Sequence, residues 1–232
     1  VEAAGVLVDL PDEQAADLIE DLSPEGAAAI VDALPGDELA DILAEVDEDE
    51  AEAILDAMAP KEAAVARRLL HYSEDTAGGI MLTEFLSFPV SHTVAEVLED
   101  LKDNREVYSD YGIQYAYITS ESGALRGVLK MRDVLLATPD SAVGGLMIDD
   151  PLRAQVDTPL EELVDIFEEN RFIGMPVVDA SGILVGVIRK AAVNEAAEKR
   201  SRQTYLKASG IVGGEELRTM PIWSRIGRRL TW

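Results

Sequence analysis

The stretches SHTVAEVLEDL (residues 91–101) and VDTPLEELVDIF (residues 156–167) decide the fold of the larger part of the chain, because they are two copies of one pattern. Each is followed by a Ser-Gly pair between two apolar runs, in SGALRGVL (residues 122–129) and SGILVGVI (residues 181–188). Runs rich in Val, Ile, Tyr and Phe alternate with helical stretches over residues 80–195, which is typical of strand–helix alternation. The sequence therefore predicts two tandem copies of an α+β module, with a hairpin turn at each Ser-Gly pair.

Both copies contain the pattern of a capping box before their helical stretch. Thr93 is followed three residues later by Glu96, and Thr158 is followed in the same way by Glu161. In such a box the threonine hydroxyl and the glutamate carboxylate each accept a hydrogen bond from a backbone N–H of the first turn. We therefore expect one helix to begin directly after Thr93 and another directly after Thr158.

The N-terminal segment repeats itself every 12 residues. The recurring apolar residues, each followed by a turn rich in Pro, Ser, Asp or Glu, are Leu10, Leu22, Leu34, Val46 and Met58. Within the repeats, as in LPGDELADILAE (residues 34–45), Ala, Leu and Ile recur at helical spacing behind an acidic first turn. Because a helix of about ten residues is marginal alone, these helices must stack on one another. The pattern predicts a small α-superhelix over residues 9–71.

Charge and composition exclude several classes of function. The chain has 232 residues and a formal net charge of −25, and residues 1–60 contain no Lys or Arg. Nucleic-acid binding requires a basic footprint, so we expect no nucleic-acid partner. There is no cysteine and there are only two histidines, so any bound metal is expected to be a hard, oxygen-ligated cation. No cysteine nucleophile, Gly-x-Ser-x-Gly motif or phosphate loop is present, and we expect no enzymatic activity.

The C-terminal part differs from the rest, because residues 189–232 carry ten basic and four acidic side chains. Trp223 and Trp232 bracket three arginines, and aromatic residues beside a basic cluster suit the cytoplasmic surface of a membrane. We expect membrane contact near residues 221–232, the alternative being a disordered basic tail. No run approaches the ~20 apolar residues of a membrane span. Since the chain starts at Val1, we expect a soluble fragment of a longer protein.

Three stretches carry a resemblance to a known family. HYSEDTAGGIMLTEF (residues 71–85), LRGVLKMRDVLLATP (residues 125–139) and GMPVVDASGILVGVI (residues 174–188) resemble, in order and spacing, the intracellular region of MgtE magnesium channels. The most specific element is the junction DTAGGIM (residues 75–81). The resemblance implies a multidomain α and α+β fold, in which an N-terminal α-superhelical repeat is followed by a tandem pair of CBS domains and a C-terminal connecting helix.

The resemblance divides the chain into four parts. These are an acidic helical repeat (1–72), a first CBS domain (73–143), a second CBS domain (144–195), and a connecting, plug-like helix with a basic tail (196–232). It also implies a homodimer through the CBS domains and an attached transmembrane domain, with the region lying on the cytoplasmic face of the cell membrane.

The resemblance further implies a sensor whose domains come together when magnesium is high and close the pore. The residues supply an independent physical reason for such a response. Packing one acidic surface on another costs ~1 to 4 kcal/mol for a close pair of charges, and bound Mg²⁺ would offset that cost. Because Mg²⁺ keeps several waters and takes one or two carboxylates, facing Asp and Glu side chains suffice.

Carried over position by position, the family's metal ligands match only in part. The matching residues, with Glu52 as a near match, are Asp17, Asp49, Glu52, Glu161, Glu195 and Glu198. The family would carry acidic residues at four positions that are occupied here by Pro159, Arg171, Ala192 and Arg200. We therefore hypothesise that Arg171 and Arg200 form direct salt bridges to the acidic domain in place of part of the metal. The alternative for each carboxylate is a solvated helix face.

The resemblance also implies one adenine-nucleotide site, for ATP or a related nucleotide. Tyr115 and Phe172 match the positions that stack on the base, and Arg132 with Asp133 match the polar positions. The second copy lacks the equivalent aspartate, because Ala192 occupies that position. The alternative for the two aromatic residues is a place in the core.

Two other functions remain open from the residues alone. A CBS-based adenine-nucleotide sensor could regulate another effector, and the helical repeat could be a scaffold for an unrelated protein.

Overall fold

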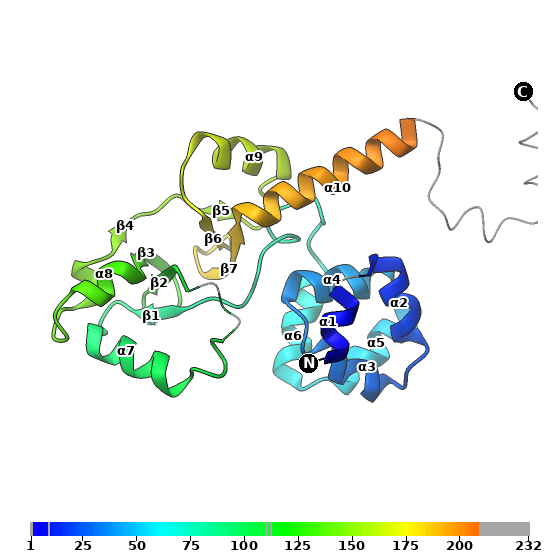
Figure 1. Cartoon of the computed structure of the whole chain (residues 1–232), viewed down its shortest axis with the longest axis horizontal. Helices are drawn as coiled ribbons and strands as arrows, with labels where there is room; N and C mark the ends of the chain where they lie inside the picture. Colours follow the sequence, from blue (N-terminus) through cyan, green and yellow to red (C-terminus); the bar gives the residue numbers. More distant parts are fainter. Residues whose placement is uncertain (1, 9, 110, 112, 209–232) are drawn as a thin grey trace, which may run out of the picture.

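The structure is a computed structural model, and it describes residues 2–8, 10–109, 111 and 113–208. The N-terminal part contains the described helices α1 (Glu2–Val8), α2 (Asp12–Glu20), α3 (Pro24–Val31), α4 (Gly36–Glu45), α5 (Glu48–Ala57) and α6 (Pro60–Leu69). Helices α2 to α6 begin at 12-residue intervals, so the structure confirms the predicted helical repeat. Figure 1 shows these helices stacked on one another as a separate unit.

Local chemistry explains where the repeat helices begin and which faces they bury. The Ser23 hydroxyl accepts a hydrogen bond from the backbone N–H of Gly26 at 3.2 Å, and Pro24 occupies the first helical position of α3. Ala27 and Val31 lie one turn apart on the same face of α3 and are fully buried. Such small apolar faces let short helices pack closely, so the core of the repeat is built from Ala, Leu, Ile and Val.

The first CBS domain is built around a four-stranded sheet. Its described elements are β1 (Ser87–Pro89), α7 (Val94–Asp103), β2 (Tyr115–Thr119), β3 (Leu125–Lys130), α8 (Met131–Leu136), a 3-10 turn (Val143–Gly145) and β4 (Ile148–Asp149). The strand order is β1-β2-β3-β4, with β1 parallel to β2 and the other pairs antiparallel. Tyr115 pairs with Lys130, so α8 starts at the same end of the hairpin as β2.

The second CBS domain repeats the plan with three strands. Its elements are β5 (Ala154–Gln155), α9 (Leu160–Glu169), β6 (Gly174–Val178), β7 (Leu184–Arg189) and the helix α10 (Lys190–Ala208) that follows. β5 runs parallel to β6, and β6 is antiparallel to β7. The two predicted hairpin turns are confirmed: Gly123 and Gly182 have φ angles of 82° and 78°, which favour glycine.

The predicted capping box is confirmed in the first copy only. The Thr93 hydroxyl accepts from the backbone N–H of Glu96, and the Glu96 carboxylate accepts from the backbone N–H of Thr93 at 2.7 Å. In the second copy the prediction is wrong, because α9 begins at Leu160 with Pro159 as its N-cap residue. The Thr158 hydroxyl instead accepts from the backbone N–H of Gln155 at 2.9 Å, outside the helix.

The junction DTAGGIM connects the helical repeat to the second CBS domain. The backbone N–H groups of Ala77 and Gly78 donate to the carbonyls of Thr158 and Val156, both at 2.8 Å. A Cβ at Gly78 would lie 2.5 Å from the Tyr72 ring, and one at Gly79 would collide with the Ser73 carbonyl. Both glycines are therefore required by close packing, which explains the specificity of this motif. The junction falls within the expected first CBS domain (73–143), but its backbone hydrogen bonds attach it to the second CBS domain.

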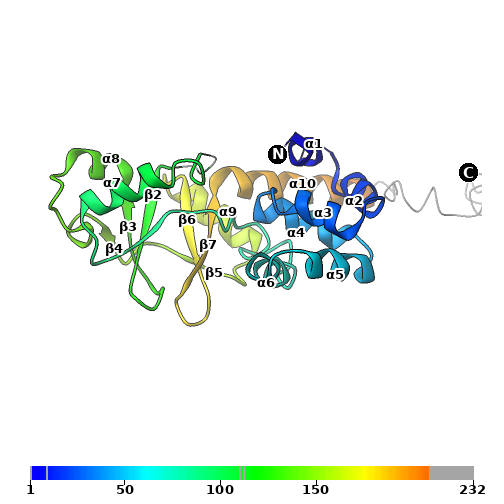
Figure 2. The ribbon, with the colours of Figure 1, turned by 90° about the horizontal axis from the view of Figure 1, so that it is seen from below.

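Helix α10 is continuous with the second CBS domain and lies against the helical repeat. It starts directly after β7 and runs through the boundary that we expected at residue 195, so the connecting helix has no separate start. Figures 1 and 2 show it passing α9 and extending over α4, with the two CBS domains and the repeat arranged in a row. Ala40 and Leu69 of the repeat share a buried cluster with Met81 and Phe167, so repeat and second CBS domain have a common core.

Within the described residues, no helix combines the length and the apolar character that a membrane crossing requires. The expected membrane contact near residues 221–232 lies outside the described part of the chain.

Candidate functional site

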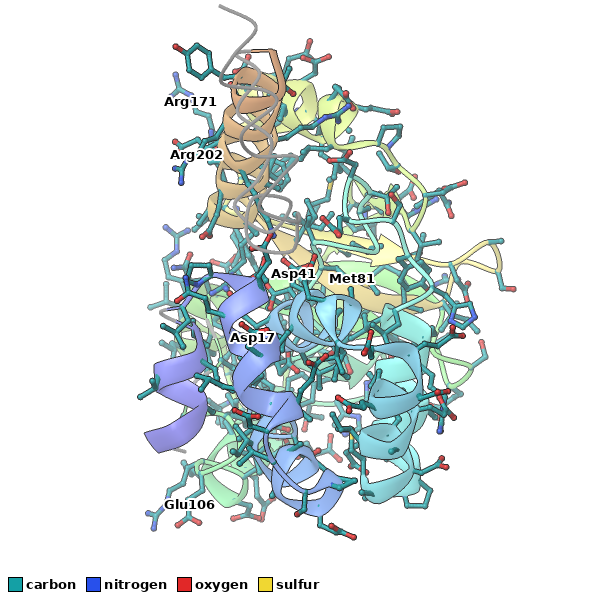
Figure 3. All side chains as sticks on the ribbon, turned by 90° about the vertical axis from the view of Figure 1, so that its right-hand side faces the viewer. Asp17, Asp41, Met81, Glu106, Arg171 and Arg202 are labelled. Carbon is teal, nitrogen blue, oxygen red and sulfur yellow. The ribbon has the colours of Figure 1, made fainter. Side chains whose placement is uncertain are left out.

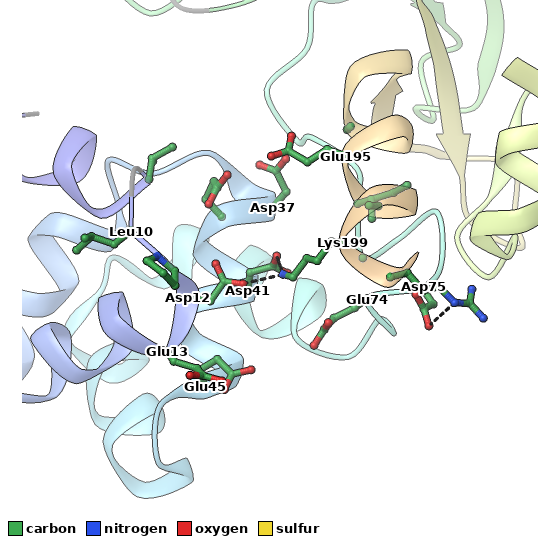
Figure 4. Close-up of a pocket in the computed structure, with 18 residues that line it drawn as sticks. Leu10, Asp12, Glu13, Asp37, Asp41, Glu45, Glu74, Asp75, Glu195 and Lys199 are labelled. Atoms are coloured by element: carbon green, nitrogen blue, oxygen red, sulfur yellow. Dashed lines mark hydrogen bonds and ion pairs between the residues drawn. The ribbon is translucent and has the colours of Figure 1, made fainter. Parts of the chain in front are cut away.

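A cavity of about 490 Å³ lies between the helical repeat, the junction and α10. Its carboxylate lining comes from the repeat, the junction and α10 and consists of Asp12, Glu13, Asp37, Glu38, Asp41, Glu45, Glu74, Asp75 and Glu195. The basic residues that line it are Lys199 and Arg200 of α10. Figure 4 shows the acidic side chains of the repeat facing α10 across this space. The cavity is thus strongly acidic.

Lys199 reaches from α10 into the repeat. Its Nζ atom lies 2.7 Å from Asp12 Oδ2 and 3.1 Å from Asp41 Oδ2 (Figure 4). Burial lowers the pKa of Lys199, but the hydrogen bonds and charges of Asp12 and Asp41 raise it by more. The net shift of the pKa is therefore upward. The side chain is therefore cationic over the whole physiological pH range, and a single ammonium group joins α2 and α4 to α10.

Arg200, the next residue, faces other partners. Its Nη1 atom lies 2.6 Å from Glu161 Oε1 on α9, and its Nε atom lies 3.7 Å from Asp75 Oδ2 in the junction. Neither partner belongs to the helices of the repeat. Arg200 thus links α10 to the second CBS domain and the junction.

Asp37, in the first turn of α4, is half-buried where the repeat meets the linker to the first CBS domain. Its Oδ1 atom and the Oε2 atom of Glu84 are both buried without a hydrogen-bond partner among the described residues. The pKa of Asp37 is raised to about 6, because burial outweighs the opposing backbone hydrogen bonds and the attraction of Arg189, and the charge of Glu84 adds a smaller increase. The contact is close, because a Cβ at Gly36 would lie 2.8 Å from Thr83 Oγ1.

Glu38 is the second perturbed carboxylate of this surface. Burial, followed by the neighbouring charges of Asp37, Asp12, Asp41 and Glu195, raises its pKa to about 7. Burial also raises the pKa of Asp41, although Lys199 opposes the shift. All three carboxylates are less stable in their charged form here than in water, so packing at this surface carries an electrostatic cost.

The structure separates most of the predicted metal ligands. Asp17 on α2, Asp49 on α5 and Glu198 on α10 are exposed, and Figure 3 shows Asp17 on the repeat. Glu52 pairs with Arg67 at 2.6 Å, and Glu161 pairs with Arg200. Glu195 alone of the predicted set lines the cavity. Within the described residues no group of three or more His, Cys, Asp or Glu side chains is arranged to hold an ion, so these ligands stay predictions.

The hypothesis about direct salt bridges requires a correction. Arg171 forms no ion pair with another described side chain, and Arg200 pairs with Asp75 and Glu161, outside the repeat helices. The residue that bridges α10 to the repeat is Lys199, a basic residue that the family's acidic positions do not predict. Asp12, Asp37 and Asp41 were missed as well. Asp12 and Asp37 lie in the first turn of a repeat helix and Asp41 lies one turn further along α4, and other acids of the repeat share these kinds of position.

The predicted nucleotide ligands converge in part. Tyr115 starts β2, and Arg132 and Asp133 lie in the first turn of α8 at the same end of the hairpin. Arg132 Nε lies 3.4 Å from Asp133 Oδ1, and the arginine is exposed. Phe172 packs edge-on against Phe167 with the ring centroids 5.1 Å apart.

The start of β6 approaches β2, which brings the two CBS copies together near these residues. A Cβ at Gly174, two residues after Phe172, would lie 3.6 Å from the Tyr117 hydroxyl, two residues after Tyr115. Tyr115 and Phe172 as a base-stacking pair remain a prediction.

An acidic helical repeat docked on a CBS pair through a charged connecting helix defines a class of regulatory protein. Residues 1–75 match the MgtE intracellular N domain, and residues 77–140 and 143–199 match the CBS domain. The chain belongs to the MgtE family. The magnesium transporter MgtE of Thermus thermophilus is 33% identical over 152 residues, which cover 66% of this chain and 33% of that protein.

Solved structures agree with this assignment. The cytosolic domain of the Mg²⁺ channel MgtE in complex with ATP is similar with a TM-score of 0.67 and 33% identity, covering 82% of each chain. The soluble part of a magnesium transporter has a TM-score of 0.71 at 22% identity, covering 84% of this chain and 81% of that one, and supports the fold.

The family confirms the fold class and the expectation that this region is not an enzyme. The chain spans about a third of the length of the relative in Thermus thermophilus.

Proposed function

We propose that the chain is the Mg²⁺-sensing regulatory region of a magnesium channel or transporter, on the cytoplasmic face of the cell membrane. It gates an attached transmembrane domain by closing the helical repeat onto the CBS pair and α10 when Mg²⁺ binds. The observation that carries the proposal is the acidic cavity, whose carboxylates come from the repeat, the junction and α10. A cation in this cavity would contact all three, and the family relationship supplies the identity of the cation.

The electrostatics of the cavity supply the driving force. Two unit charges about 4 Å apart repel by ~4 kcal/mol at the effective dielectric of a protein surface. Burial is the main cause of the raised pKa values of Asp37, Glu38 and Asp41, and repulsion from neighbouring carboxylates adds to it most clearly at Glu38. A divalent cation would offset both effects, so closure becomes linked to the Mg²⁺ concentration.

The donor set suits Mg²⁺ better than a softer ion. The lining side chains that can bind a cation are carboxylates, and the cavity of about 490 Å³ has room for a cation that keeps most of its water shell. Mg²⁺ loses its waters reluctantly and is commonly held by one or two carboxylates. Binding of a hydrated ion does not require a preformed group of three ligands. Glu195, which lines the cavity, is the predicted ligand best placed for this role.

A second candidate function is adenine-nucleotide binding between the CBS copies, and the ATP complex of the similar MgtE cytosolic domain favours it. Tyr115, Arg132 and Asp133 share one end of the β2–β3 hairpin, where stacking on a base and hydrogen bonding to a ribose are chemically compatible. Nucleotide would then adjust the geometry of the CBS pair, and Mg²⁺ would control the repeat.

We further propose a homodimer formed through the CBS domains. Leu135 and Leu136 of α8 are 71% and 79% exposed, and adjacent leucines this accessible favour burial against a second copy. The attached membrane domain and membrane contact near residues 221–232 complete the proposed assembly.

Small-angle X-ray scattering of this chain tests the function. We expect the radius of gyration to fall as Mg²⁺ rises to millimolar concentrations, with ionic strength matched by NaCl. ATP without Mg²⁺ should leave the radius unchanged. Contraction with ATP alone would favour the nucleotide sensor, and no response to either ligand would favour the scaffold.

A further inference from the structure

Two consecutive basic residues of α10 contact different parts of the molecule. Lys199 contacts Asp12 and Asp41 of the repeat, whereas Arg200 contacts Glu161 of the second CBS domain and Asp75 of the junction. Neighbouring residues of a helix point about 100° apart, so one turn of α10 can contact both the repeat and the second CBS domain. The ion pairs of Arg67, by contrast, stay within the repeat.

The Lys199 contact lies inside the acidic cavity and is partly shielded. The exposed fractions of the three side chains are 43% for Lys199, 28% for Asp12 and 29% for Asp41. Asp12 and Asp41 come from different helices of the repeat and converge on one ammonium group. A cation that receives two carboxylates in a half-buried position makes stronger interactions than an isolated surface pair.

We propose that Lys199 is a built-in counter-cation that holds the helical repeat on α10 when no divalent ion is bound, and so lowers the Mg²⁺ concentration needed for closure. This rests on the proposed function and deepens it. Arg200 anchors the same turn of α10 to the second CBS domain, so the repeat docks on a helix that is itself fixed in place.

The lysine has two properties that a free ion lacks. It is covalently attached, so its local concentration does not depend on the metal concentration of the solution. It also carries one charge instead of two, and it leaves the carboxylates of Asp37, Glu38 and Glu195 without an equivalent partner in the described structure. Lys199 therefore supports closure in part and leaves the remaining acidic surface to respond to Mg²⁺.

The test uses the 232-residue chain and three variants. Lys199→Gln removes the charge and keeps a polar side chain, Lys199→Arg keeps the charge, and Arg202→Gln is the matched control. Arg202 lies on the same helix, is exposed, and forms no ion pair with a described side chain (Figure 3). Both glutamine variants change the net charge equally.

We expect Lys199→Gln to raise the Mg²⁺ midpoint of the contraction by about five-fold, the size expected for losing one favourable ion-pair site. Arg202→Gln and Lys199→Arg should remain within about two-fold of the unchanged chain. In EDTA, Lys199→Gln should have a larger radius of gyration than the control. Circular dichroism checks that every variant is folded.

The proposal that Lys199 is a counter-cation is overturned if Lys199→Gln and Arg202→Gln contract at the same Mg²⁺ midpoint and have equal radii of gyration in EDTA. If the unchanged chain does not respond to Mg²⁺ at all, the proposed function fails. The radii in EDTA then still decide whether Lys199 holds the repeat on α10.

Discussion

Acidification in the absence of divalent cations should close the molecule, because Asp37 and Glu38 are half-buried carboxylates at the surface where the repeat meets its neighbours. In the docked arrangement the pKa of Asp37 is raised from 3.8 to about 6 and that of Glu38 from 4.5 to about 7, chiefly by burial. A carboxylate with a higher pKa in the docked arrangement binds its proton more tightly there. Protonation therefore favours docking, and the electrostatic cost is fully present only above about pH 7.

The pKa shift of Asp37 sets the size of the effect. About two pKa units correspond to ~3 kcal/mol between docked and open arrangements at neutral pH. This is an upper limit, because part of the burial arises within the repeat itself. Glu38 acts in the same direction, but its greater exposure and its coupling to Asp37 reduce its share to ~1 kcal/mol or less. The cost disappears as the pH falls from about 7 through the ordinary pKa values near 4.

Scattering in EDTA between pH 8 and pH 5 measures this effect. We expect the radius of gyration to fall with pH, and we expect Asp37→Asn to be contracted already at pH 8 with a weaker pH response. Asp32→Asn is the control, because Asp32 is exposed on the repeat and the variant carries the same charge change. If Asp37→Asn and Asp32→Asn have the same radius at pH 8 and the same pH profile, Asp37 does not oppose docking and the reasoning is refuted.

Two further predictions concern the contact at α4 and the nucleotide site. Gly36→Ala places a methyl group 2.8 Å from Thr83 Oγ1 and should weaken docking, seen as a larger radius at saturating Mg²⁺, whereas Gly5→Ala has open space and should have no effect. Equal radii of gyration for Gly36→Ala and Gly5→Ala at saturating Mg²⁺ would contradict a role of the close contact at Gly36 in docking. Asp133→Ala should weaken ATP binding, measured by calorimetry, by about ten-fold through loss of a charge-assisted hydrogen bond, relative to the exposed control Asp140→Ala. Unchanged affinity would exclude Asp133 as a ligand.

Elements set by local chemistry were predictable from the sequence. The 12-residue period defines helices because each repeat carries its own turn and its own apolar face, and α2 to α6 follow it. The Ser-Gly turns require a conformation that glycine adopts most easily, so both hairpins could be placed. The capping box of Thr158 failed because the pattern does not report whether a hydroxyl will bond forward into the helix or backward to Gln155.

The contacts of the site could not be predicted in the same way. Lys199 is separated by 187 residues from Asp12 and by 158 from Asp41, so no local pattern links them. Which face of α10 meets the repeat depends on how the junction packs on the second CBS domain. That packing depends on the space available to Gly78 and Gly79. The overall charge predicts an acidic surface, and only tertiary packing selects the carboxylates that become buried.

The continuity of β7 with α10 gives the molecule a mechanical property. The helix has 19 residues, contains neither glycine nor proline, and leaves the sheet without an intervening loop. It is therefore a stiff rod of ~28 Å whose base is part of the second CBS sheet. A tilt of about 10° at the sheet would displace the far end by ~5 Å over that length. A small tilt at the second CBS sheet would thus move the far end of α10 by about the length of one helical turn.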